Sequence, residues 1–110
     1  MQSESRAGQQ AFGDIAAKLA QLSDSVFFDD VWQRPELSPR ERSLITVAAL
    51  VALNRLEQLP FHLQLAQRNG VAHQQLAELI THLAFYAGWP AAASAVARLR
   101  GLEPEAPHAV

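Results

Sequence analysis

A short polar segment that follows a long apolar run contains the residue types best suited to chemistry. Asn54, Arg55, Glu57 and Gln58 come directly after the apolar run, and His62 follows a little further on. An imidazole titrates near neutral pH and can exchange a proton, while an arginine can hold a carboxylate through two parallel hydrogen bonds. This segment is therefore the first candidate for an active site. In the alternative interpretation, His62 is hydrogen-bonded at a subunit contact, and Arg55 and Glu57 form a local ion pair on a turn.

Other side chains could contribute to a site from elsewhere in the chain. Arg42 lies in the first turn of a predicted helix, where a cation opposes the helix dipole, so we expect it to have a specific partner such as a carboxylate. Arg34 and Trp32 are interpreted mainly as an interface contact, with a ligand clamp as the alternative. Tyr86 could offer its hydroxyl to a ligand or to a buried carbonyl. His82 is expected to pack in a core or an interface, with a role in a pocket as the alternative. The histidines do not show a metal-ligand spacing, so no metal is predicted.

The apolar run Leu44–Leu53, in which only Thr46 is polar, is the element that must position these residues. Ser38 and Pro39 followed by Glu41 form a helix start signal, with a cap, a proline in the first turn and a capping box. A helix that is apolar all round needs cover on every side, and ten residues are too few to span a bilayer. We therefore expect a central helix of a core that other subunits complete.

Helical spacing of apolar residues predicts further helices on both sides of this run. The predicted helices, separated by glycine and proline stop signals, cover about 9–22, 24–33, 38–54, 56 or 60 to 69, 73–87 and 90–100. Ser23 or Asp24 is expected to cap the second of them. The sequence thus predicts an all-α domain, a compact bundle of five to six helices spanning residues 9–100. Residues 1–8 are expected to form a disordered segment and 101–110 a loose tail.

Composition excludes several classes of protein. The 110 residues have a net charge of -2 and contain no basic stripe, so nucleic acid is not an expected partner. The chain has no cysteine, which removes disulfides, thiol catalysis and thiolate metal sites. Its polar start lacks the apolar stretch of a signal peptide and no membrane span is predicted, so a cytoplasmic location is expected. Because a chain of this size buries only a modest share of its surface, 49% hydrophobic content favours an oligomer.

Three motifs occur in a characteristic order along the chain. They are WQRPELSPRERSLITVAALVALNR at 32–55, the pattern H-x(7)-G at His62–Gly70 and FYAGWPAA at Phe85–Ala92. Together they resemble the carboxymuconolactone decarboxylase family, which belongs to the alkylhydroperoxidase D-like superfamily, over about Phe27 to Leu99. The resemblance implies a cofactor-free, all-helical subunit whose central helices share a core in a homo-hexamer, built as a trimer of dimers.

A second branch of the same superfamily carries Cys-x-x-Cys ahead of the histidine and reduces hydroperoxides. By the resemblance, Arg55 and Gln58 stand at these two cysteine positions. Attack on a peroxide needs a thiolate nucleophile, so thiol peroxidase activity is excluded for this chain.

The reaction that names the family removes carbon dioxide from a carboxylated muconolactone during aromatic catabolism and leaves an enol-lactone. It places negative charge on the conjugated lactone, so the site needs a donor for the enolate oxygen, a proton source and a cation that orients carboxylates. The resemblance implies a cofactor-independent lyase in which His62 is the acid/base, Glu57 orients it, and Arg42 and Arg55 hold carboxylates. The predicted catalytic residues are His62, Glu57 and Arg42. The other predicted substrate-binding residues are Arg55, Arg34, Trp32, Tyr86 and Gln58.

Two alternatives use the same pocket. The first is a non-catalytic oligomeric module that binds a small ligand or a partner protein. It is favoured by Gln58, which stands where the family's decarboxylases tend to have an acid, and by Phe27 and Phe28, which replace part of a His-Ala-Trp-Gly-Asp sequence. The second is isomerisation of a lactone or an enol, which needs the same residue types as decarboxylation.

Overall fold

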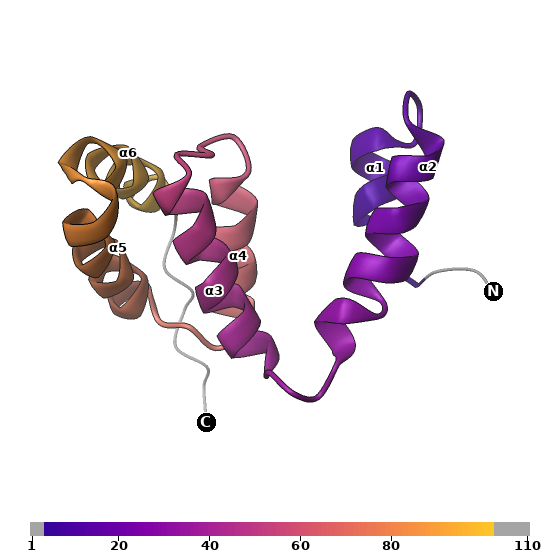
Figure 1. Ribbon diagram of the computed structural model, residues 1–110, viewed down its shortest axis with the longest axis horizontal. Coiled ribbons are helices and arrows are strands. Elements are labelled where there is room, and N and C mark those ends of the chain that lie inside the picture. Colours follow the sequence, from indigo (N-terminus) through magenta and orange to yellow (C-terminus); the bar gives the residue numbers. More distant parts are fainter. Residues whose placement is uncertain (1–3, 103–110) are drawn as a thin grey trace. The chain divides into compact units, whose positions relative to one another are not determined.

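The computed structural model describes residues 4–102, which contain helices and connecting turns but no strand (Figure 1). The six α-helices are α1 (Ala7–Phe12), α2 (Ala17–Gln21), α3 (Pro39–Ala52), α4 (Leu59–Arg68), α5 (His73–Ala87) and α6 (Trp89–Arg100). A π-helix at Leu22–Phe28 and a 3₁₀ turn at Val31–Gln33 lie between α2 and α3. The predicted all-α class is confirmed. No helix within 4–102 is both long enough and apolar enough to cross a membrane.

The chain divides into two units, an N-terminal unit (Met1–Pro39) and a core unit (Arg40–Val110), and each is described by itself. In the core unit, α3 to α6 contribute aliphatic side chains to one continuous cluster. Its buried members include Val47, Val51, Leu59, Leu63, Ala66, Val71, Leu76, Ile80, Ala95 and Leu99. Helices α3 and α4 are antiparallel, because Asn69, just after α4, donates a 3.0 Å hydrogen bond from Nδ2 to Oγ of Ser43 near the start of α3.

Helix boundaries in the core unit follow the predicted start and stop signals closely. Helix α3 begins at Pro39, α4 has Pro60 in its first turn, and α5 covers His73–Ala87 as predicted. Gly70 and Gly88 end helices with φ angles of 96° and 97°, a left-handed conformation that only glycine adopts without strain. These predictions are confirmed because each signal acts locally within its own turn.

The N-terminal unit departs from its predicted helices. The single helix expected over 9–22 is wrong, because the chain breaks after α1 and turns back into α2, which continues directly into the π-helix. Asp24 was expected to cap the next helix, but it lies inside the π-helix instead. Its carboxylate accepts hydrogen bonds from the backbone N–H groups of Gly8 (2.7 Å) and Gln9 (3.0 Å) at the start of α1. The cap therefore stabilises a helix that lies earlier in the sequence.

The start of the described chain is tied to the same unit. Glu4 and Ser5 donate their backbone N–H groups to the carboxylate of Asp29, at 2.7 Å and 3.2 Å. The segment 1–8 that was predicted to be disordered therefore overlaps an ordered stretch and the first residues of α1. Residues 1–3 of that segment, and 103–110 of the predicted loose tail, lie outside the described residues.

The nearly uninterrupted apolar sequence of α3 leaves one of its faces exposed. Ser43, Val47 and Val51 are buried, whereas the side chain of Ile45 on α3 is 54% exposed and that of Leu53, in the turn just after α3, is 65% exposed. Exposed large aliphatic side chains on a central helix are typical of a surface that another molecule covers. Cover by further subunits stays a prediction.

Candidate functional site

His62 is held at the rim of the core near the start of α4. Leu59, one turn before His62 on α4, and Leu63, the next residue, are fully buried, so the helix fixes His62 in a half-buried position beside them. Its ring packs edge-on against Phe61, with centroids 5.0 Å apart. Burial lowers the pKa of His62 below its ordinary value of 6.5, because the charged form loses contact with water. At pH 7 the imidazole is therefore mainly neutral, with one N–H donor and one acceptor nitrogen.

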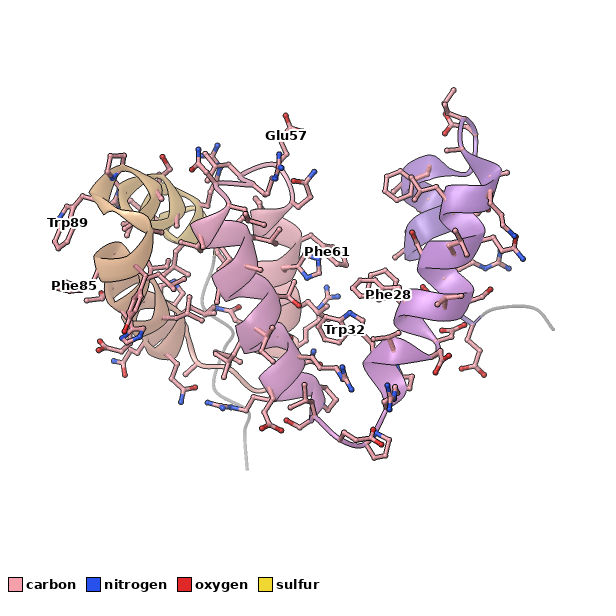
Figure 2. All side chains as sticks on the ribbon, in the orientation of Figure 1. Phe28, Trp32, Glu57, Phe61, Phe85 and Trp89 are labelled. Carbon is pink, nitrogen blue, oxygen red and sulfur yellow. The ribbon has the colours of Figure 1, made fainter. Side chains whose placement is uncertain are left out.

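Three other predicted residues lie on the loop that joins α3 to α4. The chain turns at Asn54, whose φ is 57°, and Arg55, Glu57 and Gln58 are then exposed. Figure 2 shows Glu57 projecting away from the helices at this loop. Arg55 and Glu57 form no ion pair within the described part of the chain, which does not support the local ion pair considered from the sequence. The loop thus places an exposed cation and an exposed acid at the end of the core unit where α4 begins.

Arg42 occupies the other end of α3. It is half-buried, with its Nε atom out of contact with water. Because ten residues separate Arg42 from the last residue of α3, the helix carries the chain about 15 Å before it reaches the loop that holds Glu57. The fold of one chain therefore does not bring Arg42 and Glu57 together at one small substrate.

Tyr86 and His82 lie one turn apart on α5. Their rings pack at a centroid distance of 5.0 Å, and both side chains are exposed. His82 is therefore not a core residue, and the structure leaves an interface role untested. The hydroxyl of Tyr86 belongs to a side chain that is 76% exposed, so it is available to a ligand rather than to a buried carbonyl.

Trp32 and Arg34 belong to the N-terminal unit and are described only within it. Trp32 is buried and packs with Phe27 and Phe28, at ring-centroid distances of 6.2 Å and 6.4 Å. Arg34 is exposed and pairs with Glu36, with Nε 3.6 Å from Oε2. These contacts lie within one unit, so both the predicted interface contact and its alternative, a ligand clamp, stay predictions.

Two cavities in the core unit contain none of the residues predicted to be catalytic or substrate-binding, but His82, for which a pocket role was the alternative, lines one of them. One has a volume of about 550 Å³ between α5 and α6, and its lining is Ile80, Thr81, Ala84, Phe85, Trp89, Ala92, Ala93, Val96 and Arg100. Figure 2 shows Phe85 and Trp89 at this corner of the core unit. The other, called here the α3–α5 groove, has about 380 Å³ and is lined by Arg40, Leu44, Ala48, Gln75, Glu78, Leu79, His82 and Leu83. The helical spacing of its lining residues on both helices was visible in the sequence, but nothing there showed that the two helices face each other.

No group of three or more His, Asp or Glu side chains that could hold a metal ion occurs within residues 4–102. The side chains of His62, Arg55, Glu57 and Gln58 carry imidazole, guanidinium, carboxylate and amide groups. Such a set can bind carboxylates, donate hydrogen bonds to a developing oxyanion and move protons.

Comparison with known proteins places the chain in a class. A family model described as the carboxymuconolactone decarboxylase family matches residues 17–100. The chain therefore belongs to the carboxymuconolactone decarboxylase family, and the resemblance that its motifs indicated is confirmed.

Two curated relatives match the chain in part. The 4-carboxymuconolactone decarboxylase of Acinetobacter baylyi is 46% identical over 67 residues, covering 61% of this chain and 50% of the relative. The nitrosuccinic acid decarboxylase of Metarhizium robertsii is 35% identical over 66 residues, covering 60% of this chain and 46% of the relative. The chain spans about half the length of the curated relatives it matches.

Proposed function

We propose that the protein is a cofactor-independent decarboxylase of a small carboxylated lactone of the 4-carboxymuconolactone type, acting in cytoplasmic catabolism of aromatic compounds. The observation that carries the proposal is the 46% identity to a 4-carboxymuconolactone decarboxylase within a family match that covers most of the chain. The second relative is also named a decarboxylase, which supports the reaction type more strongly than any one substrate.

The chemistry requires a site that accepts negative charge. Breaking the bond between the lactone and its carboxylate releases carbon dioxide and leaves the electron pair in the conjugated lactone as an enolate. Protonation at carbon then completes the reaction, so each turnover takes up one proton. His62, mainly neutral because burial lowers its pKa, can donate its N–H to the enolate oxygen and relay the proton from water. Arg55, on the loop before α4, supplies the cation that orients the carboxylate.

The separation of Arg42 from Glu57 supports a role for other subunits. Since these residues lie at opposite ends of α3, one small substrate does not reach both in a single chain. We propose a homo-oligomer, a hexamer built as a trimer of dimers, in which sites form where neighbouring copies meet. The exposed Ile45 on α3 and Leu53, in the turn just after α3, provide apolar surface for such contacts.

A non-catalytic binding module is the second candidate. It is favoured by the exposure of Arg55, Glu57 and Gln58, which lie outside both described cavities. An exposed loop suits reversible binding of an anion or a protein, whereas decarboxylation benefits from a site that excludes water.

Incubation of the pure protein with 4-carboxymuconolactone separates the two candidates. The decarboxylase predicts release of carbon dioxide and formation of the enol-lactone, with the Acinetobacter baylyi enzyme as the positive control. Nitrosuccinate is tested in parallel. Turnover of nitrosuccinate alone would retain the decarboxylase class and reject the lactone, and no carbon dioxide from either compound would reject the proposed reaction.

A further inference from the structure

The α3–α5 groove combines an apolar floor with a cation at one end. Leu44, Leu79 and Leu83 are half-buried and pack against the core cluster, so they form a fixed aliphatic surface. Arg40 lies at the start of α3, and Ala48 lies eight residues further along the same lining. At about 1.5 Å of rise per helical residue, the α3 side of the groove is about 12 Å long. The volume of the groove, about 380 Å³, lies in the range of small-molecule sites.

The guanidinium of Arg40 has no ion pair among the described residues. Arg40 is half-buried, and neither Glu78 nor any other described acid lies within ion-pair distance of it. Its stem lies over the turn between α4 and α5, where a Cβ on Gly70 would be 4.0 Å from Arg40 Cδ. A half-buried cation that no described acid neutralises is suited to an anion from outside the chain.

We propose that the α3–α5 groove is a binding site for small amphiphilic carboxylic acids, with the carboxylate on Arg40 and the apolar body along Leu44, Ala48 and Leu83. An unbranched acid of about eight carbons matches a lining of about 12 Å. The groove shares no residue with the proposed active site, so failure of the decarboxylase proposal leaves this one standing.

The other polar groups of the groove determine which ligand fits best. Glu78 and His82 follow Gln75 on the α5 side of the groove at helical spacing, and all three side chains are exposed. Glu78 repels a carboxylate, but its charge is screened by water. A ligand with a single negative charge at its Arg40 end therefore fits the groove better than a ligand with negative charges along its whole length, because only the second would place a charge beside Glu78. A polypeptide helix in the groove is the competing occupant, and the experiment below includes it.

Four ligands test the charge and the apolar body separately on the full chain. Octanoate carries both, acetate carries only the head, 1-octanol only the tail, and octylammonium carries the opposite charge. Isothermal titration calorimetry below the micelle concentration should show octanoate binding at least about tenfold more tightly than each of the other three. Equal binding of octanoate and octylammonium would overturn the proposal, because it would show that Arg40 does not select the ligand.

Variants then locate the site. Arg40→Gln should weaken octanoate about tenfold, and Arg40→Lys should weaken it less because the charge remains. Arg98→Gln, which removes an exposed cation of α6 outside the groove, is the matched control and should leave binding unchanged. Glu78→Gln should tighten octanoate about twofold, because it removes a like charge from an exposed position that the fold does not need.

A steric variant decides between the acid and a polypeptide. Ala48→Phe fills the middle of the groove and should abolish octanoate binding without changing the molar mass measured by light scattering. Unchanged octanoate binding in Arg40→Gln or in Ala48→Phe would overturn the proposal. A lower molar mass for Ala48→Phe would assign the groove to a contact between copies of the chain and would also overturn it. Circular dichroism confirms that each variant keeps its helices.

Discussion

The two units of the molecule are stabilised in different ways. Among residues 4–39, the only buried apolar side chains are Ala20 and Trp32, and the helices are joined by carboxylates that accept backbone hydrogen bonds. The core unit instead buries a continuous aliphatic cluster drawn from four helices and the turn before α5. The first arrangement depends on a few polar contacts with precise geometry, and the second depends on the volume and spacing of many apolar side chains.

This difference bears on function because the candidate residues divide between the units. His62 is positioned by the aliphatic core, through Leu59 and Leu63, and so has a rigid support. Trp32 and Arg34 belong to the unit that is stabilised by hydrogen bonds. Changes in the core should therefore alter the candidate site and the stability together.

The largest effect is expected from Leu63→Ala. Leu63 is completely buried, and its loss leaves a cavity, so the free energy of unfolding should fall by about 2–5 kcal/mol. Urea denaturation followed by circular dichroism measures this change. Leu19→Ala is the matched control in the N-terminal unit, where the side chain is 49% exposed, and it should cost about 1 kcal/mol or less. Equal costs for the two variants would contradict the proposed difference between the units.

Gly8→Ala should produce the next largest effect, seen in the N-terminal unit. A Cβ on Gly8 would lie 2.6 Å from the carbonyl oxygen of Ala20 and 2.7 Å from Cβ of Ser23, so α1 must move away. Such overpacking typically costs about 1–3 kcal/mol. Amide hydrogen exchange should become faster throughout α1. Gly101→Ala, whose Cβ would meet its nearest described atom at 3.6 Å, should leave exchange in α1 as it is.

Asp24→Asn should loosen the same helix less than Gly8→Ala. Burial raises the pKa of Asp24, but hydrogen bonds from Gly8, Ser5 and Gln9, together with the charge of Arg6, outweigh it and lower the pKa below 3.8. The carboxylate's stabilisation of α1 is therefore complete above pH 3.8 and is lost as the pH falls through the lower folded-state pKa. Exchange at Gly8 and Gln9 should accelerate in Asp24→Asn at pH 7. In the unchanged protein it should accelerate only in strong acid, and equal protection in both proteins at pH 7 would reject the carboxylate's role.

The smallest effect concerns the charge of His62 in the core unit. Its folded-state pKa is lowered by burial, so the unfolded chain binds more protons once the pH falls below about 6.5. The free energy of unfolding should therefore decrease as the pH drops from 7, until the folded-state pKa is passed. Thermal unfolding at a series of pH values should show a shallower decrease for His62→Gln than for the unchanged protein. Parallel curves would indicate that His62 is as well solvated in the folded chain as in the unfolded one.

The sequence predicted the core unit well because its helices are bounded by local signals. Pro39, Gly70 and Gly88 act within one turn, and the apolar spacing of α5 identifies its buried face without knowledge of its neighbours. In the N-terminal unit, the decisive contacts join residues that are far apart in sequence, such as Gly8 and Asp24. The spacing of apolar residues does not indicate such a contact, so the sequence predicted neither the break after α1 nor the π-helix.

The sequence supplied the residue types of the candidate site but not how the fold arranges them. The structure places His62 next to the loop that holds Arg55, Glu57 and Gln58, as their closeness in sequence indicated. It places Arg42 at the far end of α3. Residue type alone does not show this separation, because it depends on the distance between residues along the helix axis. The α3–α5 groove was missed because it depends on which two helix faces lie side by side.

We propose that His62 transfers the proton in decarboxylation. The rate of carbon dioxide release from 4-carboxymuconolactone by His62→Ala measures this role. The control is His73→Ala, at the start of α5 and outside both described cavities. Loss of a general acid/base lowers a rate by about 10²- to 10⁴-fold, so His62→Ala should fall by that factor while His73→Ala stays close to the unchanged protein. Full activity in His62→Ala would show that His62 does not transfer the proton.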